Sequence, residues 1–384
     1  MMRILFSTMP ASGHLRALVP IAHAAIVAGH EVAMCTPASA KAQVTSYGLT
    51  HLPAGRDWVG EQLVAAADET ETPPDHAERL THHLNTEGYP GPEALRTARD
   101  IIGHAQTWRP DVIVRENAEF GGYLAAEALG LPHASVGASP AYMDPALFAP
   151  GLDAGRAALG LPPDPTGRRS NAPLHATLIP PELDPGEHVV PNSRAYRQTN
   201  PALPGERLPD WVAGFGEPVV FAAFGTMYSK LAAWHPVIRA VIAGLGLLGL
   251  PTVVAAGIPT APFEPAPSNV RLVERIAQPA LLECSALFLH HGGFNSIRES
   301  LRLGVPMVII PWVTDSLINA RGCAEAGVST TLYQDALTPE SVRDACAAML
   351  AEPAYARRAA AVRTRMLTLP PLDELVADIV ALAR

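Results

Sequence analysis

Short apolar runs alternate with amphipathic segments along the chain, and this alternation predicts the fold class. In the first half, apolar strands are predicted at residues 3–8, 30–37 and 111–117, and helical segments at 17–28 and 121–132 follow the first and third of them. Strands that alternate with helices are typical of a parallel sheet covered by helices. The first half of the chain is therefore predicted to be an α/β domain.

The same alternation restarts after residues 196–218, where prolines and glycines interrupt any regular pattern and indicate an interdomain linker. Thr338, Pro339 and Glu340 supply an N-cap, a first-turn proline and an acidic first turn for a later helix. We therefore expect two doubly wound, Rossmann-like domains that face each other across a cleft. The strands of the second half are predicted at 218–226, 251–257, 286–291 and 306–311, and its helices at 235–248, 295–304, 317–327 and 341–350.

Length and charge narrow the possible functions. A chain of 384 residues favours two domains, because one hydrophobic core rarely organises so long a chain. Its net charge of -9 argues against a nucleic-acid-binding protein, which needs a concentrated basic face. No apolar run approaches the roughly 20 residues that span a bilayer, and the first residues lack the pattern of a signal peptide. We expect a cytoplasmic protein that neither binds nucleic acid nor inserts into a membrane.

The most specific segment of the sequence, residues 290–320, places a histidine, two glycines and Asn-Ser between a buried strand and a helix. Glycines allow the backbone to approach a ligand closely, and the N-terminus of a helix presents N–H groups to an anion. His291 and Ser296 add further donors, and Glu299 is placed to accept hydrogen bonds from ribose hydroxyls. This pattern predicts a nucleoside diphosphate as the ligand.

The segment resembles the donor signature of the GT-B glycosyltransferases of family 1, which include plant natural-product and bacterial antibiotic transferases. That signature combines H-x-G-x-N-S, a glutamate eight residues after the histidine, G-V-P, and an aspartate followed by N-A. The resemblance implies the GT-B fold, a nucleotide-sugar donor and inverting transfer without a metal. The matching positions are His291, Gly293, Asn295, Ser296, Glu299, Gly304-Val305-Pro306, Asp315 and Asn319-Ala320.

With this resemblance the chain is expected to divide into four parts. They are an N-terminal acceptor-binding domain (1–205), a linker (206–216), a C-terminal nucleotide-sugar-binding domain (217–366) and a C-terminal helix (367–384). The last segment has the spacing of an amphipathic helix, and in the family such a helix crosses back to the N-terminal domain. The state of assembly, monomer or homodimer, is left open.

Further donor contacts are expected outside the motif. Ile276 and Gln278 hold the positions that the family uses around the nucleobase, although Ala277 replaces the usual proline. Thr226 belongs to a Gly-Thr turn that resembles the family's contact to the diphosphate. Ser316 stands where glucose-transferring relatives have glutamine after the aspartate. The shorter side chain favours a deoxysugar donor, such as a thymidine diphosphate (TDP) sugar, over glucose.

The start of the chain resembles the part of the family that acts on the acceptor. Gly13 and His14 follow the first strand, similar to the family's G-H-x-x-x-P, and Gly13 is counted among the donor contacts. In the family this histidine is the general base, and imidazole can take a proton near neutral pH. An acidic residue at the end of a later strand orients the histidine in the family. Glu116 holds that position, and Glu119 is a second candidate.

Other assignments remain open or are disfavoured at this stage. His82 and His83, with His76 nearby, could suggest a metal site, but no fourth ligand supports one, and neither a metal nor a cofactor is expected. The acceptor is expected to be a small lipophilic natural-product aglycone contacted by residues 57–107 and 140–186, both of which are rich in proline and irregular. Alternative functions are a UDP-glucose-type transferase of broad acceptor range, a GT-B epimerase, a transferase of cell-wall lipids and a non-catalytic nucleotide-sugar-binding helper.

Overall fold

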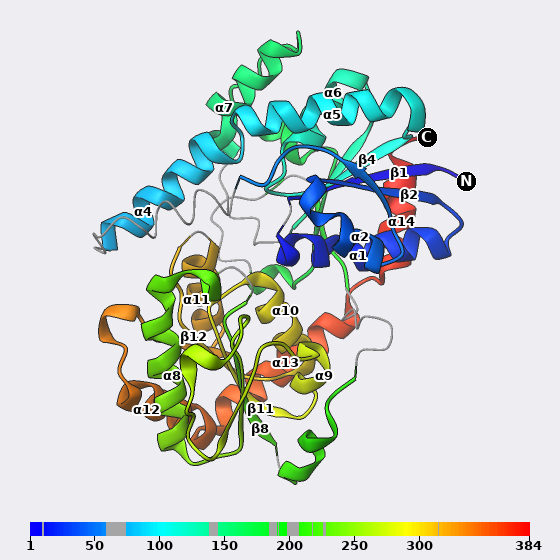
Figure 1. The fold of residues 1–384 in the computed structure, drawn as a ribbon. Coiled ribbons are helices and arrows are strands. Elements are labelled where there is room, and N and C mark those ends of the chain that lie inside the picture. The colour runs from blue at the N-terminus through cyan, green and yellow to red at the C-terminus, as the bar shows by residue number, and fades with distance from the viewer. Residues whose placement is uncertain are drawn as a thin grey trace. The chain divides into compact units, whose positions relative to one another are not determined.

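A computed structural model of the 384-residue chain shows two compact units (Figure 1). Unit 1 comprises Met1–Gln62, Thr72–Thr199 and Leu369–Arg384, and unit 2 consists mainly of Asn200–Thr368. No helix in the described part of the chain combines the length and the apolar character needed to cross a membrane. The residues that the structure describes are 1–9, 11–58, 74–137, 145–183, 190, 192–197, 207–216, 218–225, 228–313 and 315–384.

Unit 1 contains a seven-stranded parallel sheet with the strand order β3-β2-β1-β4-β5-β6-β7. Its strands are β1 (Arg3–Ser7), β2 (Glu31–Thr36), β3 (Thr50–Pro53), β4 (Val112–Glu116), β5 (His133–Val136), β6 (Leu174–Thr177) and β7 (Ser193–Ala195). Its helices are α1 (Ser12–Val27), α2 (Lys41–Ser46), α4 (Pro74–His83), α5 (Pro92–Trp108), α6 (Gly121–Leu129), α7 (Pro145–Ala158) and α14 (Leu372–Ala381).

Unit 2 contains a six-stranded parallel sheet with the order β10-β9-β8-β11-β12-β13. Its strands are β8 (Val219–Ala223), β9 (Thr252–Ala255), β10 (Val270–Val273), β11 (Ser285–His290), β12 (Met307–Ile309) and β13 (Ser329–Thr331). Its helices are α8 (His235–Leu248), α9 (Gln278–Leu282), α10 (Phe294–Leu303), α11 (Asp315–Glu325), α12 (Pro339–Ala351) and α13 (Pro353–Thr368).

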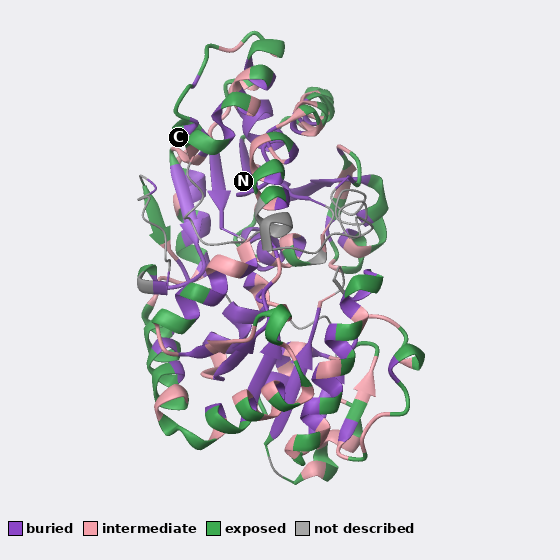
Figure 2. Ribbon diagram, turned by 90° about the vertical axis from the view of Figure 1, so that its left-hand side faces the viewer, coloured by how far each residue is buried: buried purple, intermediate pink, exposed green. Residues whose placement is uncertain are grey.

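Helices cover both faces of each sheet, so the strands are buried on two sides (Figures 1 and 2). In unit 1, α1 and α14 pack on one face, and α5, α6 and α7 on the other. In unit 2, α8 and α12 pack on one face, and α9, α10 and α13 on the other. Both strand orders follow the Rossmann pattern, in which ligands bind at the carboxyl ends of the strands where the order reverses. The predicted class, two Rossmann-like α/β units, is confirmed.

Two helices differ in how well the sequence predicts where they begin. Helix α12 begins as predicted: Thr338 Oγ1 accepts a hydrogen bond from Ser341 N–H at 3.1 Å, and Ser341 Oγ accepts one from Thr338 N–H at 2.9 Å. The apolar period predicts α1 only from residue 17, but the helix begins at Ser12, because its first turn is polar and carries no such period. The difference matters, since it places His14 on the first turn of the helix rather than in a loop.

The C-terminal segment packs on unit 1. Arg197 N–H donates to the carbonyl of Pro370 at 2.7 Å, and Arg194 of β7 forms ion pairs with Glu374 and Asp378 of α14. Helix α14 thereby covers the same sheet face as α1.

Candidate active site

A histidine and a carboxylate meet at the carboxyl edge of the unit 1 sheet. His14 lies in the first turn of α1, directly after β1, and Glu116 is the last residue of the neighbouring strand β4. Nδ1 of His14 lies 2.9 Å from Oε2 of Glu116, with the histidine side chain 29% exposed and the glutamate side chain fully buried. The extra methylene of glutamate, compared with the usual aspartate, thus still permits direct contact.

The two candidate carboxylates, Glu116 and Glu119, have different partners. Oε1 of Glu116 accepts a hydrogen bond from Ala118 N–H at 2.8 Å, which leaves Oε2 directed at His14. Glu119 instead accepts from the N–H groups of Gly121 and Gly122, at the start of α6, and from the hydroxyl of Ser7. Burial raises the pKa of Glu119, and these hydrogen bonds partly offset that effect. Among the two predicted candidates, Glu116 is the one in contact with His14.

A recess within unit 1 opens at the same edge of the sheet, and it is lined by Ala118 and Glu119 but by neither His14 nor Glu116. Residues after β1, β2, β3 and β4 line it together with the start of α5. Trp58 and Tyr89 form an edge-to-face aromatic pair with ring centroids 5.6 Å apart. Glu93 lies at the same recess and pairs with Arg56 at 2.9 Å. The walls are therefore mostly aromatic and apolar, with two carboxylates, Glu93 and Glu119, among them.

In unit 2 the equivalent edge is built around His291 and glycines. β8 and β11 end side by side at Ala223 and His290, and His291 follows directly. A Cβ atom on Gly293 would lie 2.5 Å from Nε2 of His291, and one on Gly225 would lie 2.9 Å from its Cε1. Only glycine fits at these two positions, so the backbone comes close to the imidazole ring.

Burial determines the charge of the histidine at this edge. Burial lowers the pKa of His291 to about 4, although a hydrogen bond with the backbone of Ala223 partly counteracts it. His291 is therefore neutral at pH 7. Helix α10 begins at Phe294, immediately after Gly293, so its first turn presents backbone N–H groups beside the ring. The edge offers hydrogen-bond donors and a helix dipole without a cationic imidazole.

Three residues predicted to bind the nucleotide-sugar donor, Gln278, Ser296 and Glu299, lie close together near the start of α10. Nε2 of Gln278, at the start of α9, donates to Oε2 of Glu299 at 2.8 Å and lies 3.4 Å from Oγ of Ser296. Glu299 is fully buried and Ser296 nearly so, while Gln278 is partly exposed. Ile276 is partly buried against the core of the unit. Gln278 is thus the accessible member of this group, and its amide holds the buried carboxylate of Glu299 in place.

The segment after β12 completes the same edge. Asn319 Nδ2 donates to the carbonyl of Gly292 and to Oδ2 of Asp315, both at 2.9 Å. This amide therefore connects the glycine turn to the predicted sugar-binding aspartate. Ser316 is almost fully buried: its Oγ donates to the carbonyl of Val313 at 2.7 Å and accepts from Trp312 N–H at 3.1 Å. The hydroxyl of Ser316 thus holds its own loop together.

Two further predicted residues lie in the first turns of helices. Gly13 is exposed at the start of α1, and in α10 Asn295 Oδ1 accepts from Nη2 of Arg298 at 2.7 Å. Thr226 lies outside the described residues.

The sequence pattern did not predict a role for Arg115, a buried arginine that contacts the backbone around Glu116. Its signal, one charged residue inside an apolar strand, is visible in the sequence but does not indicate a partner.

Comparison with known proteins extends the resemblance along the whole chain. Residues 256–382 match the family model described as Erythromycin biosynthesis protein CIII-like, C-terminal domain. The chain is 26% identical to the aclacinomycin-T 2-deoxy-L-fucose transferase of Streptomyces galilaeus, covering 98% of this chain and 94% of that protein. It is 27% identical to the TDP-daunosamine transferase DnrS of Streptomyces peucetius, covering 96% and 94%.

A solved structure shows the same fold. The glycosyltransferase SsfS6 of Streptomyces sp. SF2575, complexed with thymidine diphosphate, matches with a TM-score of 0.79 and 25% identity over 99% of this chain and 100% of that chain. The resemblance predicted from the donor motif and the GT-B fold are confirmed by these matches.

Proposed function

We propose that this chain, which belongs with the bacterial natural-product glycosyltransferases of GT-B fold, moves a deoxysugar from a TDP-sugar to a hydroxyl group of a lipophilic aglycone, with inversion at the anomeric carbon. The contact of 2.9 Å between Nδ1 of His14 and Oε2 of Glu116 is the observation that carries this proposal. It gives a partly exposed imidazole the carboxylate partner that a general base needs.

The proton-transfer step uses the two nitrogens of His14 differently. Contact with Glu116 directs Nδ1 toward the carboxylate, so Nε2 takes the proton of the acceptor hydroxyl. The acceptor oxygen then forms a bond to the anomeric carbon, while the bond from that carbon to the phosphate oxygen breaks. The electron pair of the broken bond leaves with the TDP. Glu116 stabilises the imidazolium that forms.

Unit 2 supplies the site for the departing diphosphate in this proposal. The first turn of α10 and the neutral ring of His291 offer hydrogen-bond donors to the phosphates, and Glu299 and Gln278 offer polar contacts to the nucleoside. These donors take the place of a metal ion in stabilising the negative charge of the leaving group, so we infer that transfer needs neither metal nor cofactor.

The class of sugar follows from Ser316 and from the relatives. Asp315 remains at the position expected to bind sugar hydroxyls, but the hydroxyl of Ser316 is used within its own loop. A sugar with fewer hydroxyl groups fits such a site better than glucose does. The relatives named for a 2-deoxy-L-fucose and for TDP-daunosamine support both the deoxysugar and the TDP nucleotide.

The acceptor is assigned to unit 1. The recess with Trp58 and Tyr89 reaches Ala118, whose N–H binds the carboxylate of Glu116, so an aglycone seated there approaches the base. Aromatic and apolar walls favour a lipophilic polycyclic or macrocyclic aglycone over a sugar or a peptide. Residues from the predicted acceptor segment 57–107 supply much of this lining.

His14→Ala tests the proposal. We expect kcat to fall by about 100-fold or more, because the base is lost, while the Kd for TDP stays within about 2-fold. The assay follows TDP release from TDP-2-deoxy-L-fucose in the presence and absence of a panel of polyketide aglycones. His23→Ala is the matched control, since His23 lies on the same helix and its Nε2 lies 2.8 Å from the carbonyl of Tyr47. Undiminished turnover in His14→Ala would exclude this mechanism, and TDP binding without any turnover in the wild type would favour the helper protein.

A further inference from the structure

Arg115 is a fully buried arginine on the strand that carries Glu116, one member of the proposed catalytic pair. It precedes Glu116 on β4, and successive residues of a strand point to opposite faces of the sheet. Glu116 therefore faces α1 and His14, whereas Arg115 shares its face with Ile113, which packs against α6. The proposed mechanism does not use this charge.

The guanidinium of Arg115 organises the turn that joins β4 to α6. Its Nη1 lies within hydrogen-bond distance of three backbone carbonyls, those of Glu116 at 3.1 Å, Asn117 at 2.7 Å and Glu119 at 3.2 Å. The carbon at its centre also lies 4.9 Å from the ring centroid of Phe120. One side chain thus holds a turn of five residues that begins at Glu116.

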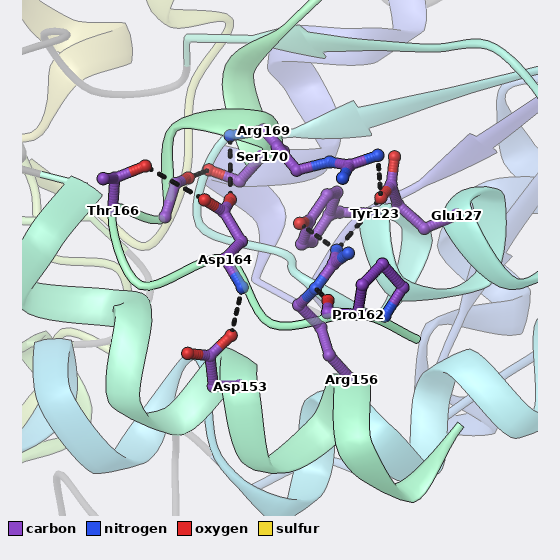
Figure 3. Close-up of polar contacts among 10 residues, drawn as sticks. Tyr123, Glu127, Asp153, Arg156, Pro162, Asp164, Thr166, Arg169 and Ser170 are labelled. Atoms are coloured by element: carbon purple, nitrogen blue, oxygen red, sulfur yellow. Dashed lines mark hydrogen bonds and ion pairs between the residues drawn. The ribbon is translucent and has the colours of Figure 1, made fainter. Parts of the chain in front are cut away.

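The other side of the guanidinium is anchored to the segment after α7. Nη2 donates to the carbonyl of Ser170 at 2.6 Å and to Oδ1 of Asn171 at 3.0 Å. Asp164 holds this segment by accepting from Arg169 N–H and from the hydroxyl of Thr166, both at 3.0 Å (Figure 3). The segment that binds Arg115 is therefore held in place by hydrogen bonds of its own.

Removal of Arg115 would leave buried polar groups without their donor. A buried carbonyl without a hydrogen-bond donor is unfavourable, so the turn is expected to rearrange toward water or other donors rather than keep its conformation. The Ala118 N–H that binds Oε1 of Glu116 belongs to this turn. The position of the Glu116 carboxylate, and hence the orientation of His14, depends on the same backbone.

Arg115 also supplies charge. Burial lowers the pKa of Arg115 to about 10, while the nearby carboxylates of Glu119 and Glu116 act in the opposite direction. The side chain is therefore cationic at neutral pH. A fixed positive charge beside two buried carboxyl groups compensates part of their desolvation cost.

We propose that Arg115 is a positioning residue for the His14–Glu116 pair, which it acts on through the backbone turn of residues 116–120 and without touching the substrate. This inference rests on the proposed function, because it assigns Arg115 a role in the reaction of that pair. It predicts that loss of Arg115 impairs the proton-transfer step while donor binding to unit 2 persists.

Arg115→Met is compared with Arg156→Met, a matched removal of a second fully buried arginine of unit 1. Arg156 binds Tyr123 and Glu127 and the carbonyl of Pro162, with no hydrogen bond to residues 116–120 among those described (Figure 3). Glu127 keeps an ion pair with Arg169 when Arg156 is replaced. If Arg115 had a purely structural role, both variants would lose thermal stability and neither would lose kcat per folded molecule.

The expected result separates the two arginines. Arg115→Met should lower kcat by about 10-fold or more, with the Kd for TDP within about 2-fold of the wild type, because small displacements of catalytic groups cost large factors in rate. Arg156→Met should keep kcat within about 2-fold while lowering Tm. Equal kcat values for Arg115→Met and wild type, each corrected for folded protein, would overturn the proposal.

A double variant shows whether Arg115 acts through His14. If it does, adding Arg115→Met to His14→Ala should change kcat by less than about 2-fold, because residues that act as a unit are not additive. A further loss of about 10-fold would show that Arg115 acts elsewhere and would reject the inference. If His14→Ala alone keeps full turnover, the proposed function fails, whatever the result for Arg115.

A milder variant covers the case in which Arg115→Met does not fold. Asn171→Ala removes one side-chain acceptor of Arg115 and leaves the backbone contacts in place. We expect kcat to fall by about 3-fold with unchanged TDP affinity, and the ring resonances of His14 in isotope-labelled protein to shift. Unchanged kcat and unchanged His14 resonances would count against the proposal.

Discussion

The two carboxyl edges of the sheets both place a histidine beside the start of a helix, and they use it in different ways. In unit 1, His14 is 29% exposed and lies 2.9 Å from the buried carboxylate of Glu116. In unit 2, His291 is enclosed by Gly225 and Gly293, and burial lowers its pKa to about 4. The first arrangement suits a group that gains and loses a proton, and the second suits a neutral hydrogen-bond donor.

The difference comes from the immediate surroundings rather than from the fold. Both units have parallel sheets with the Rossmann order, and α1 and α10 each begin a few residues after a central strand. A carboxylate partner stabilises a charged imidazole, whereas enclosure without one disfavours it. One architecture can therefore supply a base for the acceptor and a donor site for an anionic leaving group.

Gly292→Ala is expected to have the largest effect on the donor side of this comparison. Gly292 has a φ of +87°, and a Cβ there would lie 3.0 Å from the carbonyl oxygen of Ser316 and 3.1 Å from a side-chain carbon of Ile309. Strain of about 1–3 kcal/mol should displace the turn before α10 and weaken TDP binding by about 10-fold or more. Calorimetric titration with TDP measures this change.

Gly249→Ala is the matched control for Gly292→Ala. Gly249 also has a positive φ, +74°, but a Cβ added there would meet no described atom within 4 Å, and the residue follows the end of α8. This variant should lose stability through backbone strain alone and keep the wild-type Kd for TDP. If both variants bind TDP like the wild type, the turn before α10 is not part of the donor site.

Seven strands near the centres of the two sheets were predictable because each contains a short apolar run, whereas β5 and β6 of unit 1 were not predicted, since polar residues interrupt their apolar ones. β1, β2, β4, β8, β9, β11 and β12 all coincide with such runs, as expected for parallel strands buried on both faces. Short edge strands such as Thr50–Pro53 and Ser193–Ala195 carry too few apolar residues to stand out. Segment 140–186, expected to be irregular, contains α7 and β6, since Pro150 lies inside the helix without ending it.

The candidate site could be predicted in part, through its motif. The residues around His291 have a pattern whose physics points to an anion, and the pairing of Glu116 with His14 came from the family resemblance. The direction of the Ser316 hydroxyl, into the loop at Val313, depends on local backbone geometry that no spacing reveals. The role of Arg115 is equally hidden, because its partners are backbone carbonyls, which every residue carries.

Ser316→Ala should have a small effect on turnover and thereby sharpen the assignment of the sugar site. Because the hydroxyl bonds to Val313 and Trp312, its loss should lower the free energy of unfolding by about 1 kcal/mol and change kcat/KM by less than about 3-fold. Ser300→Ala is the control, since its buried hydroxyl likewise donates to a carbonyl, that of Val305 at 2.9 Å, and Ser300 is not among the residues predicted to bind the donor. A loss in kcat/KM of about 10-fold for Ser316→Ala alone would show that its hydroxyl contacts the donor.

The smallest expected effect is the dependence of donor affinity on pH. The low pKa of His291 means that its ring stays neutral above about pH 5, so the charge of the donor site does not change as the pH rises from there to about 8.5. We therefore expect the Kd of a TDP-sugar, measured with the His14→Ala variant to prevent turnover, to be flat over this range. The wild-type kcat should nevertheless fall on the acid side, since a protonated imidazole cannot accept the acceptor's proton. A Kd that rises about 10-fold between pH 5.5 and 7.5 would instead mean that His291 binds the diphosphate as a cation, and the contrast between the two histidines would be lost.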